Sequence, residues 1–374
     1  MRILISCGEA SGDLYAGALA GEIMRRQPGA EVVGFGGPRL RAAGARLLGD
    51  FAEFSVTGLT EALRVLPRSL VMLRRLVENA RVHRPDVFVP IDFPDFNFRL
   101  MAAMRRLDVP VVYYVSPQLW AWRPRRMRTM QRDVTRMLVI FPFEEAIYRN
   151  AGVDVRFVGH PLIDLVQGAS SRETFLREHG LAPEAPTVAL LPGSRRNELE
   201  RIVPVMAEAM PRVRARVPAV QFTVACAPNL PEDAFAPLAR VPRTALVHQR
   251  SDEVIASSDV AVTASGTATV QCALHERPMV VVYRLSALTY AVGKPFVKVN
   301  TYAMPNLVAG RTIVPELIQD GLTPSRVVEE TVSLLTDTER HARTRKALRD
   351  VREQLGAPGA SGRAAEAILE IARR

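Results

Sequence analysis

Short apolar runs alternate with segments of helical periodicity through the first 160 residues of the chain. Such runs are typical of buried strands, and apolar residues spaced three and four apart indicate helices between them. Strands are predicted at residues 3–5, 32–35, 87–89, 111–114 and 137–140. Strands that alternate with helices in this way predict a parallel, doubly wound sheet.

The same alternation begins again after Arg172. Strands are expected there near residues 187–191, 220–225, 244–247, 260–263 and 279–283. A chain of 374 residues also exceeds what one hydrophobic core usually supports. We therefore expect a Rossmann-like domain over residues 1–165, a second one over 166–345 and a helical tail over 346–374.

Two loops in the second half follow apolar runs and precede helical patterns. They contain small, hydroxyl-bearing and basic residues, namely Gly193, Ser194, Arg195, Ser265, Gly266 and Thr267. Unpaired backbone N–H groups and the positive end of a helix dipole converge at such loops, which suits a diphosphate. The guanidinium of Arg195 also suits phosphate oxygens, so these residues are candidates for nucleotide binding.

A glycine-containing loop also follows the first predicted strand. Its candidate ligand-binding residues are Gly8, Glu9, Ser11, Gly12 and Asp13. The loop matches neither the dinucleotide fingerprint nor a Walker loop. It does lie at the carboxyl end of a strand, where open α/β sheets bind their ligands.

Asp92 and Asp95 follow the strand predicted near residue 89. Partial burial beside aromatic residues would raise the pKa of a carboxyl group toward neutrality, so either residue is a candidate general base. Either is equally a candidate helix cap. His160, where the first domain ends, is either structural or close to a cleft between domains.

Residues 60–84 form a basic, amphipathic segment. Apolar residues recur at helical spacing at Leu63, Leu66, Leu70, Leu73 and Val77, and arginines occupy the other faces. Pro67 is expected to divide this segment into a short helix and a longer one. The apolar stripe either contacts an anionic membrane or faces the protein core below a solvated arginine face.

The formal charge of +10 has three interpretations: nucleic acid, an anionic membrane, or arginine used freely on solvated faces. The densest basic cluster, residues 123–128, follows Trp120 and Trp122 without a nucleic-acid motif, which favours the membrane. No apolar run is long enough to span a membrane, and the first residues predict a strand rather than a signal peptide. We therefore expect a cytoplasmic protein with three reduced cysteines.

Several segments, in this order, resemble the lipid-A-disaccharide synthase family of inverting GT-B glycosyltransferases. The segments are residues 8–13, 92–97, 116–123, 141–144, 191–195, 264–268 and 305–311. The resemblance covers nearly the whole chain, and the joint order of the segments is highly specific.

This resemblance implies transfer of 2,3-diacylglucosamine from its UDP donor to 2,3-diacylglucosamine 1-phosphate, which gives a β-1,6-linked disaccharide and UDP. The first domain would hold the acceptor, with Asp95 as the base for its 6-hydroxyl, and the second domain would hold UDP. Gln271 would contact the ribose, although relatives are expected to have glutamate there. Asn306 and Arg311 would line the cleft, and neither a metal nor another cofactor is implied.

Acylated substrates place the expected enzyme on the cytoplasmic face of the inner membrane, as a peripheral protein and a possible homodimer. Other UDP-sugar GT-B enzymes remain alternatives, including a peptidoglycan-precursor transferase and a UDP-sugar epimerase. A basic nucleic-acid-binding protein on the same fold is a further alternative.

Overall fold

The computed structural model describes residues 1–54, 59–119, 126–166, 170–228, 230–286 and 301–374, without the side chains of residues 53–66. The chain divides into two compact units, one of residues 1–165 and 355–374 and the other of residues 166–354. Each unit contains a sheet in which the paired strands run parallel.

The first unit contains a sheet of seven strands, in the order β3-β2-β1-β4-β5-β6-β7. Its strands are β1 (Arg2–Cys7), β2 (Glu31–Gly36), β3 (Arg46–Asp50), β4 (Val87–Ile91), β5 (Val112–Tyr114), β6 (Arg136–Val139) and β7 (Val155–Phe157). Its helices are α1 (Ala10–Arg26), α2 (Pro38–Ala42), α3 (Leu59–Val82), α4 (Pro94–Arg106), α6 (Met127–Asp133), α7 (Pro142–Asn150), α8 (Leu162–Leu165) and α18 (Ala360–Ala372).

The second unit contains a sheet of six strands, in the order β10-β9-β8-β11-β12-β13. Its strands are β8 (Thr187–Leu191), β9 (Gln221–Cys226), β10 (Thr244–His248), β11 (Val260–Ala264), β12 (Met279–Tyr283) and β13 (Glu316–Ile318). Its helices are α9 (Arg172–Glu178), α10 (Arg196–Arg216), α11 (Ala236–Ala239), α12 (Ser251–Ala256), α13 (Thr267–Leu274), α15 (Met304–Ala309), α16 (Pro324–Thr336) and α17 (Thr338–Gln354).

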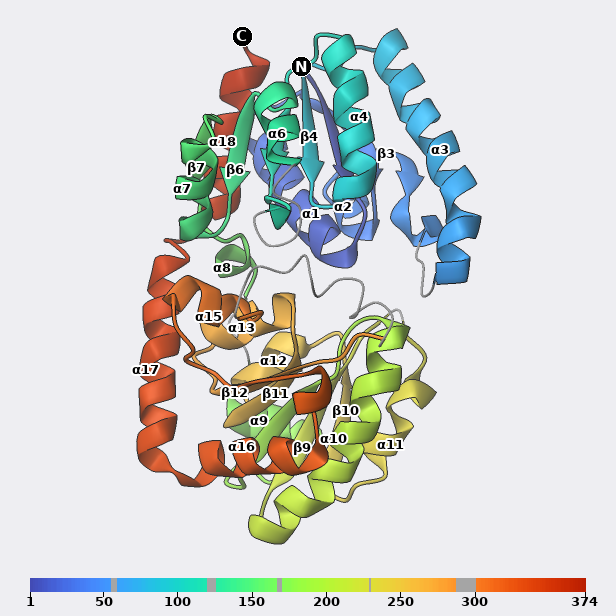
Figure 1. The fold of residues 1–374 in the computed structure, drawn as a ribbon. Helices are drawn as coiled ribbons and strands as arrows, with labels where there is room; N and C mark the ends of the chain where they lie inside the picture. Colours follow the sequence, from blue (N-terminus) through green and yellow to red (C-terminus); the bar gives the residue numbers. More distant parts are fainter. Residues whose placement is uncertain (55–58, 120–125, 167–169, 229, 287–300) are drawn as a thin grey trace. The chain divides into compact units, whose positions relative to one another are not determined.

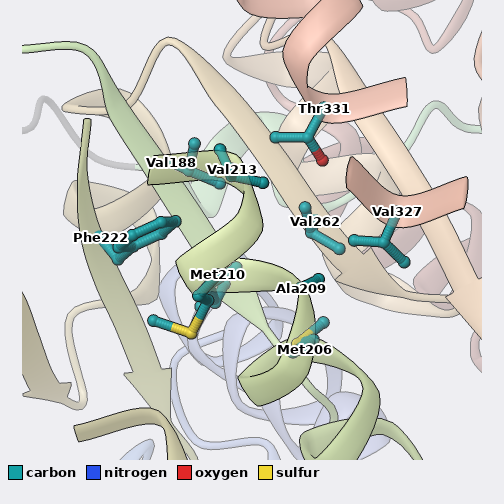
Figure 2. A pocket seen from close by; sticks show the side chains of 10 residues that line it. Val188, Met206, Ala209, Met210, Val213, Phe222, Val262, Val327 and Thr331 are labelled. Atoms are coloured by element: carbon teal, nitrogen blue, oxygen red, sulfur yellow. The ribbon is translucent and has the colours of Figure 1, made fainter. Parts of the chain in front are cut away.

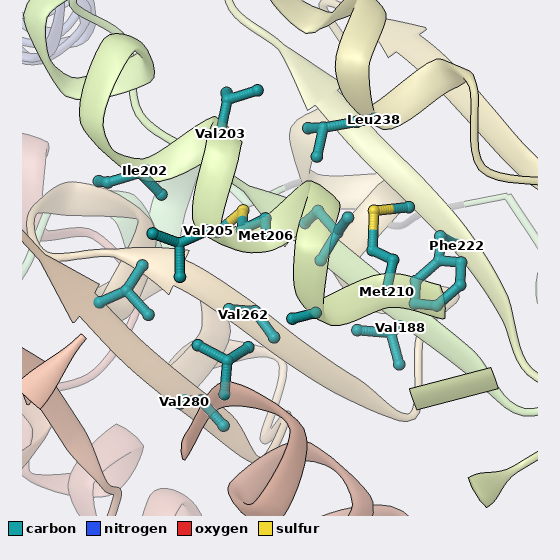
Figure 3. Close-up of a cluster of buried hydrophobic side chains, with 14 of the residues drawn as sticks. Val188, Ile202, Val203, Val205, Met206, Met210, Phe222, Leu238, Val262 and Val280 are labelled. Carbon is teal, nitrogen blue, oxygen red and sulfur yellow. The ribbon is translucent and has the colours of Figure 1, made fainter. Parts of the chain in front are cut away.

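Buried aliphatic side chains hold the helices of each unit against its sheet. In the second unit, α10 covers the sheet with Met206 and Met210, which pack among Val188, Phe222 and Val262 (Figure 3). A gap in this packing, shown in Figure 2, is lined by ten residues, nine of them apolar and none charged. Since a sugar nucleotide needs charged and polar partners, this gap is a feature of the core rather than a candidate substrate site.

The helical tail expected over residues 346–374 is divided between the two units. Helix α17 continues through residue 354 in the second unit, whereas α18 lies with the first unit (Figure 1). Helix α18 packs on α1 and buries Ala364, Ile368 and Ile371. At the start of α18, the N–H groups of Gly359 and Ser361 donate hydrogen bonds to the Asp164 carboxylate. Apolar burial and this cap explain why the last helix joins the first sheet.

Pro67 lies inside the continuous helix α3, so the expected division of this segment is wrong. A proline lacks the N–H group that would bond four residues back, and one missing bond does not prevent the remaining turns from forming. Three strands were also not predicted. They are β3, β7 and β13, short strands at sheet edges in which at most one residue is buried.

Candidate functional site

The strand order of the first unit brings two of the predicted loops together. Strands β1 and β4 are neighbours at the point where the strand order reverses, with Cys7 opposite Ile91. The loops that follow them therefore start side by side, and a side chain at Gly8 would run into the ring of Phe93. Crevices at such points are where open α/β sheets bind ligands.

The turn that follows β4 has an unusual backbone. Asp92 and Phe93 have φ angles of 46° and 50°, a region that costs non-glycine residues about 1 kcal/mol or more each. The Asp92 carbonyl accepts hydrogen bonds from Asn97 Nδ2 at 2.7 Å and from the Tyr113 hydroxyl at 3.0 Å. Asn97 is fully buried and also donates to the carbonyl of Ser6 in β1. The protein thus holds this turn in place from β1 and β5.

Asp95 lies directly after this turn, in the first turn of α4. Its side chain is 70% exposed, and its Oδ1 lies 2.8 Å from Nη1 of Arg126. Partial burial, the reason first given for a base here, is therefore wrong. The position of Asp95 is instead fixed by the Arg126 guanidinium and by its place in the first turn of α4. Arg126 is itself fixed over the ring of Phe98, 4.8 Å from its centre.

Asp13 has structural partners that the sequence pattern did not indicate. Its buried carboxylate accepts hydrogen bonds from the N–H groups of Gly37, Arg39 and Leu40, and so caps α2. Glu9 is the residue before α1, while Gly12 and Asp13 are buried in its first turn and Ser11 is partly buried. Of the predicted loop residues, Gly8, Glu9 and Ser11 therefore remain nearest to the surface.

His160 is buried between Tyr15 and Phe141, with ring centroids 5.9 and 5.2 Å away. Burial lowers the pKa of its imidazole to about 3. Nδ1 accepts a hydrogen bond from the Leu162 N–H group. This neutral, enclosed ring supports the structural interpretation of His160.

The second unit has the same arrangement at its own reversal of strand order. Strands β8 and β11 are neighbours, with Leu191 opposite Thr263. The two predicted phosphate loops follow these strands, so the strand order brings them together. Gly266 has a φ of 149°, and a Cβ there would meet none of the described residues within 4 Å.

The loop after β8 already holds an anion. Glu198, in the first turn of α10, accepts hydrogen bonds through Oε2 from the N–H groups of Ser194 at 3.0 Å and Arg195 at 3.3 Å. Gly193 has a φ of 125°, and a Cβ on it would lie 2.5 Å from the same oxygen. The sequence pattern identified the loop and did not identify this carboxylate.

Gln271 is fixed by a neighbouring acid, Asp252, which no sequence pattern indicates. Its Nε2 donates to Asp252 Oδ1 at 3.1 Å, and His275 Nε2 lies 3.3 Å from the same oxygen. Because the amide nitrogen faces Asp252, the carbonyl oxygen of Gln271 is directed elsewhere. Asp252 stands 19 residues before Gln271, in α12, so only the fold brings them together.

Asn306 is turned into the protein. Its Nδ2 donates to Val314 and Glu316, and its Oδ1 accepts from the N–H groups of Ile313 and Val314. Both donors and both acceptor positions of the amide are used, which indicates a structural role rather than the expected ligand contact. Arg311, beyond the end of α15, is exposed.

The predicted membrane stripe is only partly within the described side chains. Leu63, Leu66 and the tryptophans at 120 and 122 lie outside them. Leu70 is exposed, while Leu73 packs against the core beside Met72 and Leu76. In the described part of the chain, no helix is long and apolar enough to cross a membrane. The same part shows no cluster of acidic, histidine and cysteine side chains that could hold a metal ion.

Comparison with known proteins identifies a family. Residues 3–371 match the family described as lipid-A-disaccharide synthetase. The chain is 42% identical to the lipid-A-disaccharide synthase of Syntrophus aciditrophicus, over all of this chain and 98% of that one. It is 44% identical to the enzyme of the same name from Myxococcus xanthus, over 99% of this chain and 97% of that one.

Solved structures share the fold at low sequence identity. A UDP-GlcNAc 2-epimerase from Neisseria meningitidis, bound to UDP-GlcNAc, has a TM-score of 0.70 at 13% identity, over 99% of this chain and all of that one. The glycosyltransferase of kitacinnamycin has a TM-score of 0.66 at 20% identity, over 99% and 98% of the two chains. The expected fold class, two doubly wound parallel sheets of the GT-B type with C-terminal helices, is confirmed.

Proposed function

This chain belongs to the lipid-A-disaccharide synthase family and carries that family's glycosyltransferase activity, and we propose how its residues perform the reaction. The donor is UDP-2,3-diacylglucosamine, the acceptor is 2,3-diacylglucosamine 1-phosphate, and the products are the β-1,6-linked disaccharide 1-phosphate and UDP. Full-length relatives above 40% identity favour this activity over the epimerase and nucleic-acid alternatives, since the fold alone is shared with epimerases.

The first unit holds the acceptor, and Asp95 is the general base. The observation that supports this role is an exposed carboxylate, paired with Arg126, beside a strained turn at the carboxyl end of β4. Asp95 accepts the proton of the acceptor's 6-hydroxyl while that oxygen attacks the anomeric carbon of the donor. Arg126 holds the carboxylate in position, and Gly8, Glu9 and Ser11 border the same crevice.

The second unit holds the donor. The loops at Gly193–Arg195 and Ser265–Thr267 bind the diphosphate, and Arg195 stabilises the negative charge that grows on UDP as its bond to the anomeric carbon breaks. Gln271 accepts a hydrogen bond from a ribose hydroxyl, and the exposed Arg311 adds positive charge. Attack from the side opposite UDP inverts the anomeric configuration.

Helix α3 binds the membrane from which the acylated substrates come. The large hydrophobic residues most exposed in the described chain all lie on α3: Leu70, Val71 and Val82. Arginines surround them, and four are exposed on the same helix: Arg68, Arg74, Arg75 and Arg81. Exposed apolar side chains among arginines suit the headgroup region of an anionic inner leaflet.

Replacing Asp95 by asparagine tests the assignment of the base. The variant keeps the shape of the side chain and removes its ability to take a proton, so kcat should fall by about 10²- to 10⁴-fold with UDP binding intact. Glu145→Gln is the matched control, because Glu145 is also paired with an arginine in the first turn of a helix of the same unit. Near-normal turnover in Asp95→Asn would refute the role.

A further inference from the structure

The carboxylate of Glu198 occupies the part of the second unit to which the donor's diphosphate is assigned. It binds two successive backbone N–H groups, those of Ser194 and Arg195. Its other oxygen lies 3.8 Å from the Arg195 guanidinium, and the side chain is only 14% exposed. Two adjacent amides and a guanidinium are the donors expected around a phosphate group.

Glycine at position 193 makes room for this carboxylate. A Cβ there would lie 2.5 Å from Glu198 Oε2 and 2.9 Å from Glu198 Cβ. The φ of 125° at Gly193 also turns the chain so that the next two N–H groups point to one place. The loop is therefore an anion-binding concavity, and a side chain of the same helix fills it.

A second anion cannot share these donors with the carboxylate. Two negative charges about 4 Å apart repel strongly where little water separates them. Tyr283, at the end of β12, is close enough for the charges of Glu198 and Arg195 to act on its hydroxyl, whose pKa is raised mainly by burial. Glu198 has three side-chain torsions, so its carboxylate can leave the amides without a change in the backbone.

We propose that Glu198 is a resident anion that keeps the empty donor loop in its binding shape and that the donor's diphosphate displaces. This inference rests on the proposed function of the second unit. It adds that the Glu198 carboxylate competes with the donor's diphosphate for the same amides. Donor binding must release the carboxylate from the Ser194 and Arg195 amides. After transfer, the return of Glu198 to these amides opposes rebinding of UDP and so favours product release.

The test compares UDP binding to the full-length protein and to Glu198→Gln by calorimetry. The amide is a weaker, uncharged competitor, so the Kd for UDP should fall about tenfold, the size of one lost charge-assisted hydrogen bond. Uridine, which has no diphosphate, should bind both proteins equally. Inorganic diphosphate, like UDP, should bind Glu198→Gln more tightly than it binds the wild-type protein.

Glu200→Gln is the matched control. Glu200 lies on the same helix, is exposed and pairs with Arg196, so this variant loses the same charge without touching the loop. Its affinity for UDP should stay within about twofold. Glu198→Asp, whose shorter side chain reaches the amides less well, should also tighten UDP binding and serves if the glutamine variant does not fold.

Unchanged or weaker UDP binding in Glu198→Gln and Glu198→Asp would overturn displacement and make Glu198 a permanent part of the donor site. If the wild-type protein bound no UDP, the proposed donor site would fail together with this inference. Tighter binding of both UDP and uridine would also contradict it, because the effect would then not arise at the diphosphate.

Discussion

At the scale of single residues, the partner of each polar side chain decides what that side chain can still do. Asp95 and Asp13 both follow strands of the first sheet, yet the Asp95 carboxylate is exposed, whereas the Asp13 carboxylate is bound by three amides at the start of α2. Asn306 and Gln271 are both amides, yet among the described residues only Asn306 has all its hydrogen-bonding positions filled. These differences separate candidate ligand contacts from structural residues.

The contact between Gln271 and Asp252 leads to a prediction about donor binding. Gln271→Glu would place two carboxylates where an amide now donates to one at 3.1 Å. We expect weaker UDP binding, and recovery of most of it in the double variant with Asp252→Asn, with a coupling of about 1 kcal/mol. Calorimetry on the two single variants and the double variant measures that coupling. Additive effects of the two substitutions on UDP binding would contradict the claim that Asp252 orients Gln271.

Sequence alone identified the residues whose position in a strand-loop-helix unit is itself the signal, such as Gly193, Ser265 and Asp95. It could not identify Arg126 as the partner of Asp95, Asp252 as the partner of Gln271, or Glu198 as the acceptor in the loop after Gly193. Arg126 lies 31 positions after Asp95, and Asp252 lies 19 positions before Gln271. Glu198 is close in sequence, but a glutamate in a first helical turn is ordinary without the geometry of the loop.

At the scale of elements, the strand order determines which loops lie together, and no local sequence pattern reveals that order. The alternation of strands and helices predicted two parallel sheets. The central strands could be recognised because strands buried on both faces consist of continuous apolar runs. The reversals between β1 and β4 and between β8 and β11 then bring the predicted loops together in pairs. The assignment of α18 to the first unit required a tertiary contact, its packing on α1, which periodicity does not specify.

The segment around His160 predicts a pH dependence of stability in the first unit. The backbone N–H group of His160 donates to the Leu355 carbonyl, which joins the segment before α8 to the residues before α18. The pKa of the imidazole is about 3 when folded, against about 6.5 when unfolded, so the unfolded chain binds more protons between these values. Stability contributed by this group is therefore present above pH 6.5 and is lost as pH falls.

Between pH 7 and pH 5 this single group should cost the wild-type protein roughly 2 kcal/mol of unfolding free energy. His160→Gln should lose correspondingly less over the same interval, whatever its stability at pH 7. Urea denaturation at the two pH values measures the difference, and His83→Gln, at an exposed histidine, is the control. Equal losses in the wild type and His160→Gln would show that the imidazole is not held neutral.

At the scale of the whole molecule, charge and exposed apolar surface act together. The chain carries a formal charge of +10, and the exposed apolar residues of α3 lie among arginines. The proposed substrates carry acyl chains, and the exposed apolar residues of α3 are the surface that we propose to contact the lipid.

Vesicle flotation tests this surface. The protein should bind vesicles that contain anionic lipid, and binding should weaken as salt increases. Replacing Leu70 and Val71 by serine should reduce partitioning about tenfold, because two apolar side chains no longer enter the headgroup region. Vesicles of phosphatidylcholine alone are the control, and equal binding of variant and wild type would show that α3 is not the contact.

The most direct test of the account is UDP release from UDP-2,3-diacylglucosamine by the purified protein in EDTA, with and without 2,3-diacylglucosamine 1-phosphate. Release of UDP should depend on the acceptor, continue in EDTA and be matched by formation of the disaccharide. Equal release without acceptor would indicate hydrolysis or an epimerase-like reaction, and would contradict a transferase in which Asp95 activates the acceptor's 6-hydroxyl.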